Sequence, residues 1–594
     1  MIRYQIGSEN PAGHYFDICL NIDNPLPSGQ VVRLPAWIPG SYMIRDFAKN
    51  MVEIHAQDET GPLALTQLDK SSWCLPAVQG RVTLNYRVYA WDLSVRGAHL
   101  DTTHGFFNGT SVFLEVVGQS GYPCQVEIIA PQHDDCKSWR LATTLPRISG
   151  EDFGFGMFQA QDYQALIDHP VEMGNFQQTH FEVCGIRHDI VLTGRFECDY
   201  DRLIADLSRI CQQHIEMFGL PAPMPRYLFL VMVVGEGYGG LEHRNSTSLL
   251  CTRYDLPQPG QLESSEEYRG FLGLCSHEYF HSWNVKRIKP QVFDEPDLSS
   301  EVYTPLLWAF EGITSYYDDL ALVRSGRITQ QQYLELLGQT ITRVQRGLGR
   351  TRQSAAESSF NAWSKFYKQD ENSPNAIVSY YAKGSLIALC LDLKIRQLTG
   401  SKKSLDDVMR LLWAQYQEKG VGVGEREIQQ LVNQVANSNL DDLMENMIYR
   451  TDELPLQELL QSAGVLLSYR ERCGLQDKGG NEAKQPEMVA LGAMLKESEG
   501  GLQVVTLTEQ GAAQQAGLAA GDLIIAINGI RASMKWYQSW IASAELGHSY
   551  TLVVFRRDEL MQFEVSLQQA EKDTAMLSIA EPTNPALLSW LGCE

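Results

Sequence analysis

Residues 276–284 read SHEYFHSWN and place two histidines, His277 and His281, four positions apart. Glu278 follows the first histidine directly. On an α-helix, side chains four positions apart share one face, with Cβ atoms about 5–6 Å apart. Both imidazoles can therefore reach one ion, while Glu278 is free to accept a proton from a water molecule. The alternative is a solvated helix face that carries two histidines by chance, and the motif alone does not decide between the two.

A third ligand decides the matter, because a catalytic zinc site needs three protein ligands and one open position. Glu311 is the best candidate. It lies 30 positions after His281, in the mostly apolar stretch LLWAFEGITSYY. A carboxylate in such a helix is costly to bury unless it has a partner such as a metal ion. The alternative is a glutamate on the solvated face of that helix.

Composition narrows the class of protein. The chain has 594 residues, of which 44% are hydrophobic and 20% charged, as in a folded globular protein of several domains. Its net charge of -23 disfavours a nucleic-acid partner. The 12 cysteines are scattered and form no Cys-x-x-Cys pair, which favours a reducing compartment. Without a leader-like N-terminus or a long apolar stretch, we expect a cytoplasmic protein and no membrane partner.

Hydrophobic periodicity predicts a multidomain α+β protein. Residues 1–170 alternate apolar and polar residues in short segments separated by turn residues, which predicts a β-sandwich. Residues 171–265 are of mixed α/β character, and 266–475 have helical spacing. After a polar linker with the sequence QDKGGNEAKQ, residues 485–570 predict a small β domain, and 571–594 form a C-terminal tail.

The motif that contains His277 and His281 and the segment around Glu311 together resemble the motifs of the gluzincin metallopeptidases. HEYFHSW at 277–283 and WAFEGITSYY at 308–317 carry this resemblance. A closer resemblance is to the glycyl aminopeptidase family, which joins a β N-terminal domain, a thermolysin-like catalytic domain and a C-terminal PDZ domain. PAWIPGSYMIRDF at 35–47 and HEYFHSWNVKRIKP at 277–290 carry it, and it covers nearly the whole chain.

This resemblance implies one zinc ion per chain, held by His277, His281 and Glu311, with Glu278 as the general base. The spacing departs from the aminopeptidase N relatives, because the stretch between the second histidine and the third ligand is longer here. The extra segment is NVKRIKPQVFDEPDLSSEVY at 284–303, close to the predicted site. Its role does not follow from the resemblance.

The segment GYGGLEH at 237–243 resembles the part of these aminopeptidases that binds the substrate's N-terminus. The resemblance gives Glu242 the role of binding the free α-amine. Gly239 and Gly240 can pair with the peptide as an added strand. His243 stands where the family pattern has another residue, so its contribution stays open. Read without the family, GYGG is a plain turn.

YYAKG at 380–384 resembles the segment whose tyrosine donates a hydrogen bond to the oxyanion formed during hydrolysis. Tyr381 aligns with that tyrosine, and Tyr380 is its neighbour; without the resemblance both are core tyrosines. The resemblance implies peptide substrates with a free N-terminus and a small first residue, Gly or Ala. The sequence itself gives no size for the pocket that would receive this residue.

The C-terminal module resembles a PDZ domain, which binds an extended peptide at a sheet edge. The loop that would capture a peptide carboxylate is LGAML at 491–495, a weak match to the usual pattern. The remaining matching residues are Gly517, Gly521, Asp522, Asn528 and Gly529. Two roles of this module stay open: it binds a peptide ligand, or it only supports the catalytic domain.

Two other functions remain open at this point. The first is a peptide-binding scaffold whose peptidase domain is inactive; the complete set of motif residues argues against it. The second is a zinc endopeptidase that ignores the free amine, and Glu242 is the residue that separates it from an aminopeptidase.

Overall fold

The computed structural model describes residues 1–261, 263–482 and 485–592. Contacts divide the chain into two compact units. The first comprises Met1–Val302 with Trp413–Gly422, and the second Tyr303–Leu412 with Val423–Glu594. Residues 483–484 of the predicted linker and 593–594 of the predicted tail lie outside the described residues.

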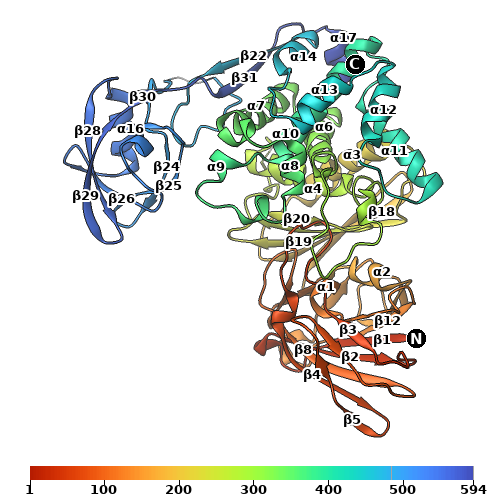
Figure 1. The fold of residues 1–594 in the computed structure, drawn as a ribbon. Helices are drawn as coiled ribbons and strands as arrows, with labels where there is room; N and C mark the ends of the chain where they lie inside the picture. Colours follow the sequence, from red (N-terminus) through yellow and green to blue (C-terminus); the bar gives the residue numbers. More distant parts are fainter. Residues whose placement is uncertain (262, 483–484, 593–594) are drawn as a thin grey trace. The chain divides into compact units, whose positions relative to one another are not determined.

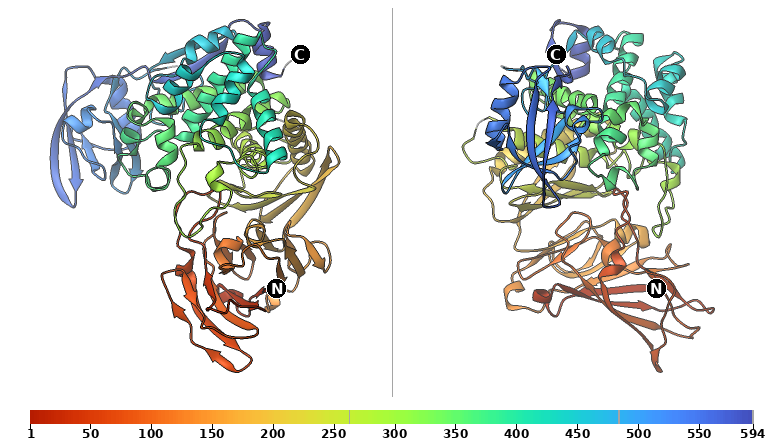
Figure 2. Two further views of the ribbon diagram at one scale, coloured as in Figure 1. Left: turned by 45° about the vertical axis from the view of Figure 1, so that its right-hand side comes forward. Right: turned by 60° about the vertical axis from the view of Figure 1, so that its left-hand side comes forward.

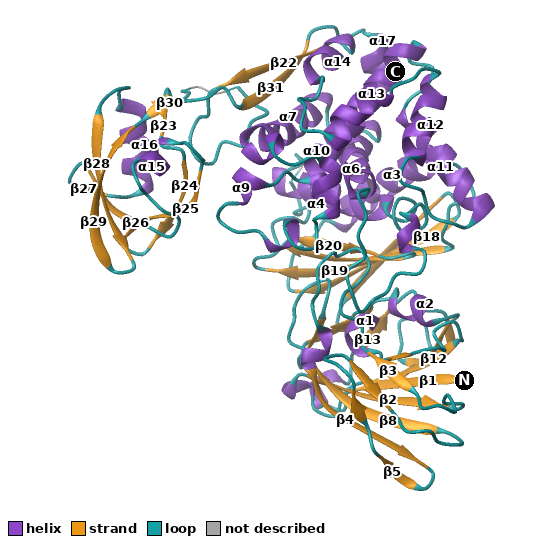
Figure 3. Cartoon of the chain, viewed as in Figure 1, coloured by secondary structure: helices purple, strands orange, loops and turns teal. Residues whose placement is uncertain are grey.

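The N-terminal part of the first unit consists mainly of strands (Figures 2 and 3). Strand β2 (Tyr15–Ile22) buries every second residue, as the alternating sequence predicts, and pairs antiparallel with β1 (Ile2–Gly7) and β8 (Val82–Tyr89). The largest sheet has the order β14 (Arg147–Ser149), β15 (Gly156–Ala160), β12 (Cys124–Ile128), β1 (Ile2–Gly7), β2 (Tyr15–Ile22), β8 (Val82–Tyr89), β4 (Met51–Asp58), β5 (Gly61–Leu63).

Two smaller sheets complete this β-rich part. One has the order β13 (Arg140–Ala142), β16 (Val171–Gly174), β10 (His104–Phe107), β9 (Ala98–Leu100). The other has the order β11 (Glu115–Val116), β3 (Val31–Arg33), β7 (Ser72–Cys74), β6 (Thr66–Gln67). Two short helices, α1 (Gly109–Val112) and α2 (Tyr163–Ile167), accompany them.

A mixed sheet and two helices form the remainder of the first unit. The strand order is β17 (Gln177–Val183), β18 (Ile186–Gly194), β19 (Arg226–Val234), β21 (Ser246–Thr252), β20 (Gly239–Glu242). Strand β19 is parallel to both neighbours, and such strands are continuously apolar because both faces are covered. Helix α3 (Tyr200–Phe218) ends at Gly219 and packs against α4 (Glu266–Phe280).

The helix that carries the histidine motif ends one residue before His281. Ser265 caps the start of α4 by accepting a hydrogen bond from the Tyr268 N–H. The helix ends at Phe280, and the chain then turns, because Trp283 N–H and Asn284 N–H both donate to the carbonyl of Phe280. The motif therefore lies at the C-terminal end of α4.

The helices of the second unit surround α10 (Tyr380–Thr399), which lies at the centre of this helical part (Figure 1). Helix α10 contacts α5, α6, α7, α8, α12, α14 and α17. The helices are α5 (Leu307–Phe310), α6 (Gly312–Arg324), α7 (Gln330–Arg346), α8 (Ala355–Phe360), α9 (Ser373–Ala376), α10 (Tyr380–Thr399), α12 (Glu427–Ala436), α13 (Asp441–Met444), α14 (Leu456–Ser462) and α17 (Pro585–Leu591); α11 (Leu405–Lys419) spans the boundary between the units.

One helical stretch, Ser373–Thr399, is long and apolar enough to cross a membrane by length and composition. Within its most apolar window, 78% is buried inside the protein. The core helix of a globular fold has the same properties, and α10 occupies that position here.

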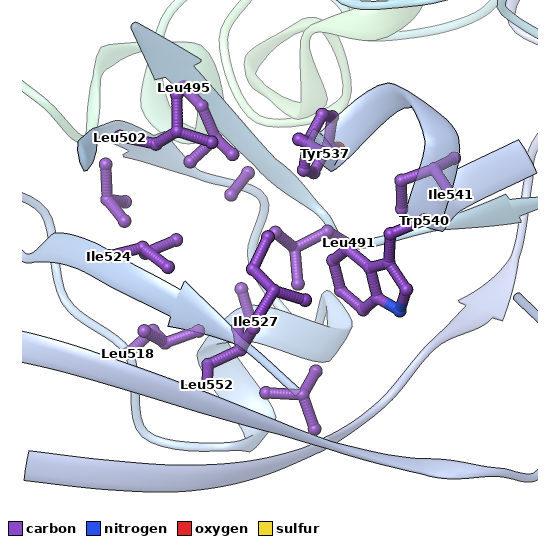
Figure 4. Close-up of a cluster of buried hydrophobic side chains, with 14 of the residues drawn as sticks. Leu491, Leu495, Leu502, Leu518, Ile524, Ile527, Tyr537, Trp540, Ile541 and Leu552 are labelled. Atoms are coloured by element: carbon purple, nitrogen blue, oxygen red, sulfur yellow. The ribbon is translucent and has the colours of Figure 1, made fainter. Parts of the chain in front are cut away.

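A small β domain near the C-terminus has its own core (Figure 4). Leu495, Ile524, Trp540 and Leu552 are among the buried side chains that α16 and the strands contribute. The sheet has the order β24 (Ala493–Ser498), β25 (Gly501–Leu507), β26 (Leu523–Ile527), β28 (Ser549–Arg556), β29 (Glu559–Ser566), with β27 (Ile530–Arg531) beside β26; its helices are α15 (Ala512–Gln515) and α16 (Met534–Ser543).

Residues beyond this small domain return to the helical part. Strand β31 (Thr574–Ile579) pairs with β22 (Val465–Arg470) and contacts α7, while β30 (Gln568–Gln569) pairs with β23 (Val489–Ala490). Helix α17 then packs against α6 and α10. The predicted α+β class is confirmed, with a β-rich N-terminal part, a helical part and a small β domain.

A buried carboxylate on α10 joins several of these helices. Asp392 accepts hydrogen bonds from the Tyr316 hydroxyl at 2.6 Å and the Leu405 N–H at 2.8 Å. It also pairs with Arg396 at 3.2 Å. The Trp590 ring N–H donates to the Tyr316 hydroxyl at 2.9 Å, so this network includes the C-terminal helix α17.

We expect Asp392→Ala to lower the free energy of unfolding of the helical part by about 3–5 kcal/mol, because it leaves the Arg396 charge buried and unpaired. The midpoint of urea unfolding followed by circular dichroism measures this. Asp134→Ala is the control, since its ion pair with Lys137 is exposed and contributes little. Equal midpoints for the two variants would contradict the assignment.

Candidate metal centre

The structure brings His277 and His281 together at the end of α4. Their Nε2 atoms lie 3.1 Å apart, with the two rings nearly perpendicular at 87°. His281 is 1% exposed, and its N–H donates to the carbonyl of His277 at 3.2 Å. Two imidazole nitrogens therefore face one point beside the last turn of the helix.

Buried polar contacts fix the position of α4 in the first unit. The Ser276 hydroxyl lies 2.8 Å from Nε2 of His214 on α3, and the Tyr279 hydroxyl lies 2.9 Å from Nε2 of His188 on β18. Tyr279 and Phe280 are fully buried among aromatic rings of the helix and sheet. The end of the helix is thus held from both sides, which positions its histidines.

The turn after α4 sets the tautomer of His281. Its Nδ1 lies 2.7 Å from the carbonyl oxygen of Asn284. A carbonyl oxygen only accepts, so Nδ1 carries the proton and Nε2 presents its lone pair toward His277. In metal sites of proteins, the ring nitrogen that does not bind the metal commonly donates such a hydrogen bond, which orients the histidine.

Glu278 lies beside the histidine pair and is 4% exposed. Its carboxylate contacts Gly240 of strand β20 so closely that a Cβ at position 240 would clash with it. Oxygen atoms of Glu242 and Glu278 and a ring nitrogen of His281 all lie within 4.8 Å of one another. Helix α4 and strand β20 therefore bring two carboxylates and an imidazole to one place.

Glu242 ends the edge strand β20, which pairs antiparallel with β21. It is 4% exposed, and no described residue forms a hydrogen bond with its buried Oε1. Gly40 lies against the carboxylate with φ of +95°; a Cβ there would be 2.5 Å from Oε1. A buried carboxylate oxygen without a partner is costly, so it suits a ligand that brings a positive charge.

His243 follows Glu242 but belongs to a different network. Its Nδ1 lies 3.3 Å from Asp168, which also pairs with Lys286 at 2.7 Å. Burial would raise the pKa of the Asp168 carboxyl, but Lys286, His243 and Arg244 outweigh it and hold that pKa well below its usual range. Burial lowers the pKa of His243, so its imidazole is neutral at pH 7.

Gly239 and Gly240 are the first two residues of β20, and both are half-buried. They pair with Leu250 and Leu249 on β21. The Arg96 guanidinium donates to the Gly240 carbonyl at 3.2 Å, which fixes this part of the edge strand.

Glu311 and Tyr381 lie in the second unit. Glu311 lies between α5 and α6 and is 1% exposed. Its N–H donates to the carbonyl of Leu307, and its own carbonyl accepts from the Ser315 N–H, so helical hydrogen bonding continues through it. Tyr381 is in the first turn of α10 and half-buried. Burial, and then the charge of Glu311, raise its pKa well above the usual value, so its hydroxyl keeps its proton at neutral pH.

The neighbouring tyrosine has a different environment. Tyr380 is fully buried, with its ring stacked on that of Tyr381 at 4.6 Å between centroids. The Tyr367 hydroxyl lies 3.1 Å from that of Tyr381. Tyr381 is thus the more exposed of the pair, and the charge of Glu311 acts on its hydroxyl.

Sequence reasoning missed several residues at this site. Asp168 lies 75 positions before its partner His243, and no local pattern links them. Tyr367 lies 14 positions before Tyr381, and Arg96 lies 144 positions before Gly240. Only Asn284 could have been anticipated, since it lies three positions after His281 and such a carbonyl often orients a metal-binding histidine.

The histidine pair fits a zinc ion. Two nitrogen ligands at ~2.0–2.1 Å in a tetrahedral site are about 3.3 Å apart, close to the observed Nε2 separation. The fixed tautomer of His281 supplies the lone pair that a metal needs, and the buried carboxylates nearby favour a divalent cation.

We expect His281→Ala to lose zinc, because it removes one nitrogen ligand. Metal content after dialysis, measured by mass spectrometry, tests this, with zinc falling at least about tenfold below that of the unchanged protein. His548→Ala is the matched control, since His548 lies exposed in the small β domain. Zinc retained in full by His281→Ala would contradict the assignment of this centre.

Three family models match the chain. The M61 peptidase N-terminal domain matches residues 3–175, the M61 glycyl aminopeptidase model matches 270–387, and a PDZ domain model matches 503–556. No curated protein sequence matches.

Among solved structures, an aminopeptidase N family protein from Idiomarina loihiensis is 44% identical over 100% of both chains, with a TM-score of 0.97. An M1 zinc metallopeptidase variant from Deinococcus radiodurans is 12% identical, covers 77% of this chain and 95% of its own, and has a TM-score of 0.48. The same variant bound to a Tyr-Ser-Ala substrate is 13% identical over 76% and 94%, with a TM-score of 0.47.

Proposed function

This chain belongs to the M61 glycyl aminopeptidase family and is a zinc metallopeptidase, and from that premise we propose that it removes single residues, Gly and Ala among them, from the free N-termini of peptides. The observation that carries this proposal is the buried carboxylate of Glu242, whose Oε1 has no partner among the described residues. It lies close to Glu278 and His281. A substrate ammonium group would satisfy it.

One zinc ion per chain is held by His277, His281 and Glu311 in this proposal. The facing Nε2 atoms of the histidines and the burial of Glu311 in an apolar helix support the set. When bound, zinc acts as a Lewis acid on the scissile carbonyl and on the attacking water.

Glu278 takes the proton of the attacking water and later delivers it to the leaving amine. Its place directly after His277 on α4, and its burial, support this role, because a base must lie within hydrogen-bond reach of the proton it removes. Gly240 leaves room for its carboxylate, since any side chain at that position would clash with it.

Tyr381 donates a hydrogen bond to the oxyanion that develops at the scissile carbonyl. A phenol can do this only while it keeps its proton, and burial together with the Glu311 charge raises the pKa of Tyr381 well above its usual value. Tyr367 holds the hydroxyl in place through a 3.1 Å contact.

Glu242 binds the substrate ammonium, so the scissile bond is the one that follows the first residue. Gly239 and Gly240 pair with the peptide along the edge of the sheet. His243 acts indirectly: its bond to Asp168 positions the chain just after Glu242, and Asp168 is in turn held by Lys286. Binding of the substrate ammonium by Glu242 distinguishes an aminopeptidase from an endopeptidase with the same metal chemistry.

The PDZ-like domain binds a peptide in this proposal. Its edge strand β24 follows Gly492, whose carbonyl accepts from the Thr508 N–H at 2.9 Å, and this fixes the loop that would receive a carboxylate. The cysteines that the structure describes are free thiols, which suits a cytoplasmic location.

Glu278→Gln should abolish hydrolysis while zinc content stays unchanged. The amide cannot accept the proton of water, and the loss of a general base lowers kcat by about 10²–10⁴-fold. Hydrolysis of a glycyl amide and metal analysis on one preparation measure both quantities. Glu236→Gln, an exposed glutamate before the edge strand, is the control. Full activity in Glu278→Gln would refute the proposed role.

Glu242→Ala should erase the preference for a free N-terminus. Losing a hydrogen bond to a charged group lowers kcat/KM for the free peptide by about 10- to 100-fold. For the same peptide with an acetylated N-terminus, kcat/KM should stay the same. Glu236→Ala serves as the control. An unchanged ratio between free and acetylated peptide in Glu242→Ala would contradict the binding of the substrate ammonium by Glu242.

A further inference from the structure

A cavity in the first unit opens beside Glu242. Its walls come from the segment Trp37–Tyr42 of the β-rich part, from the end of α2, and from residues 285–298, which belong to the segment between His281 and Glu311. The cavity volume is about 80 Å³. One water molecule needs ~10–15 Å³ on the same measure, so there is room for several. We call this the insertion pocket.

Residues 285–298 are held firmly against the β-rich part. The Ala36 N–H donates to the carbonyl of Leu298 at 2.7 Å. The indole N–H of Trp37 donates to the carbonyls of Asp297 at 3.1 Å and Ser300 at 2.9 Å. These bonds make the long segment after His281 a fixed wall.

Aromatic rings from this segment and from the β-rich part pack together at the pocket. The ring of Phe293 stacks on Tyr42 at 5.8 Å between centroids and lies 6.4 Å from the ring of Trp37. Leu298 and Ile167 add aliphatic surface. The pocket therefore offers apolar side chains on most sides.

The lysines that line the pocket are already paired. Lys286 pairs with Asp168 at 2.7 Å, and Lys289 pairs with Asp294 at 3.5 Å. Arg244 also lines the pocket and pairs with Asp168 at 3.6 Å. These cations disfavour a basic ligand side chain. Glu242 also lines the pocket, and no described residue forms a hydrogen bond with its buried Oε1.

We propose that the insertion pocket receives the side chain of the substrate's first residue, and that it admits Leu and Met in addition to Gly and Ala. This rests on the proposed binding of the substrate ammonium to Glu242. The ammonium and the side chain leave the same carbon atom, so a side chain whose ammonium contacts Glu242 reaches the adjoining cavity. Leu and Met have four side-chain heavy atoms each, which the volume accommodates, and no charge to desolvate.

Leu298→Trp tests the proposal by filling the pocket. We expect kcat/KM for leucyl and methionyl amides to fall by about tenfold or more relative to the glycyl amide, which needs no pocket. The glycyl amide thus reports on folding and on the catalytic residues in the same preparation. Leu68→Trp, the same change at a residue that is 55% exposed, should leave the ratio unchanged.

Phe293→Ala is the second variant and enlarges the pocket instead. It should raise kcat/KM for a phenylalanyl amide by about tenfold relative to the glycyl amide. Unchanged ratios in both variants, or a wild-type enzyme that cleaves the glycyl but neither the leucyl nor the methionyl amide, would overturn the inference. Failure to cleave any aminoacyl amide would overturn the proposed function as well, so the two failures are distinguishable.

Discussion

Two carboxylates, Glu242 and Glu278, are buried within 4.8 Å of the imidazole of His281, and the rest of the site depends on this concentration of hydrogen-bond acceptors. Buried anions are expensive unless cations or donors balance them. In the proposed function, zinc and the substrate ammonium would supply that balance. The surrounding chain is shaped to keep the carboxylates close: glycine at positions 40 and 240 leaves the space that they occupy.

The scaffold supplies order where the chemistry needs it. Helix α4 is fixed through Ser276 and Tyr279, so its histidines face one point without support from the metal. Strand β20 is fixed at the sheet edge through its pairing with β21 and through Arg96. Asp168 holds the residues just beyond that strand. Positioned side chains on rigid elements favour catalysis, because little reorganisation is needed when the substrate binds.

The sequence predicted the parts of this arrangement that are local. The spacing of His277 and His281 on a helix, the apolar setting of Glu311 and the alternating N-terminal strands all follow from short-range patterns. The turn after Phe280 does not follow from a short-range pattern, because backbone hydrogen bonds of Trp283 and Asn284 stabilise it and no glycine or proline marks it. Asp168 and the insertion pocket were not predictable either, since both depend on segments that meet only after folding.

The most direct test is a crystal structure of the zinc-loaded enzyme with a phosphinic dipeptide analogue whose N-terminus is free, using anomalous scattering at the zinc edge. We predict one zinc peak bound by Nε2 of His277 and His281 and by Glu311, with the analogue's ammonium on Glu242. A peak elsewhere, or an ammonium that does not contact Glu242, would contradict it.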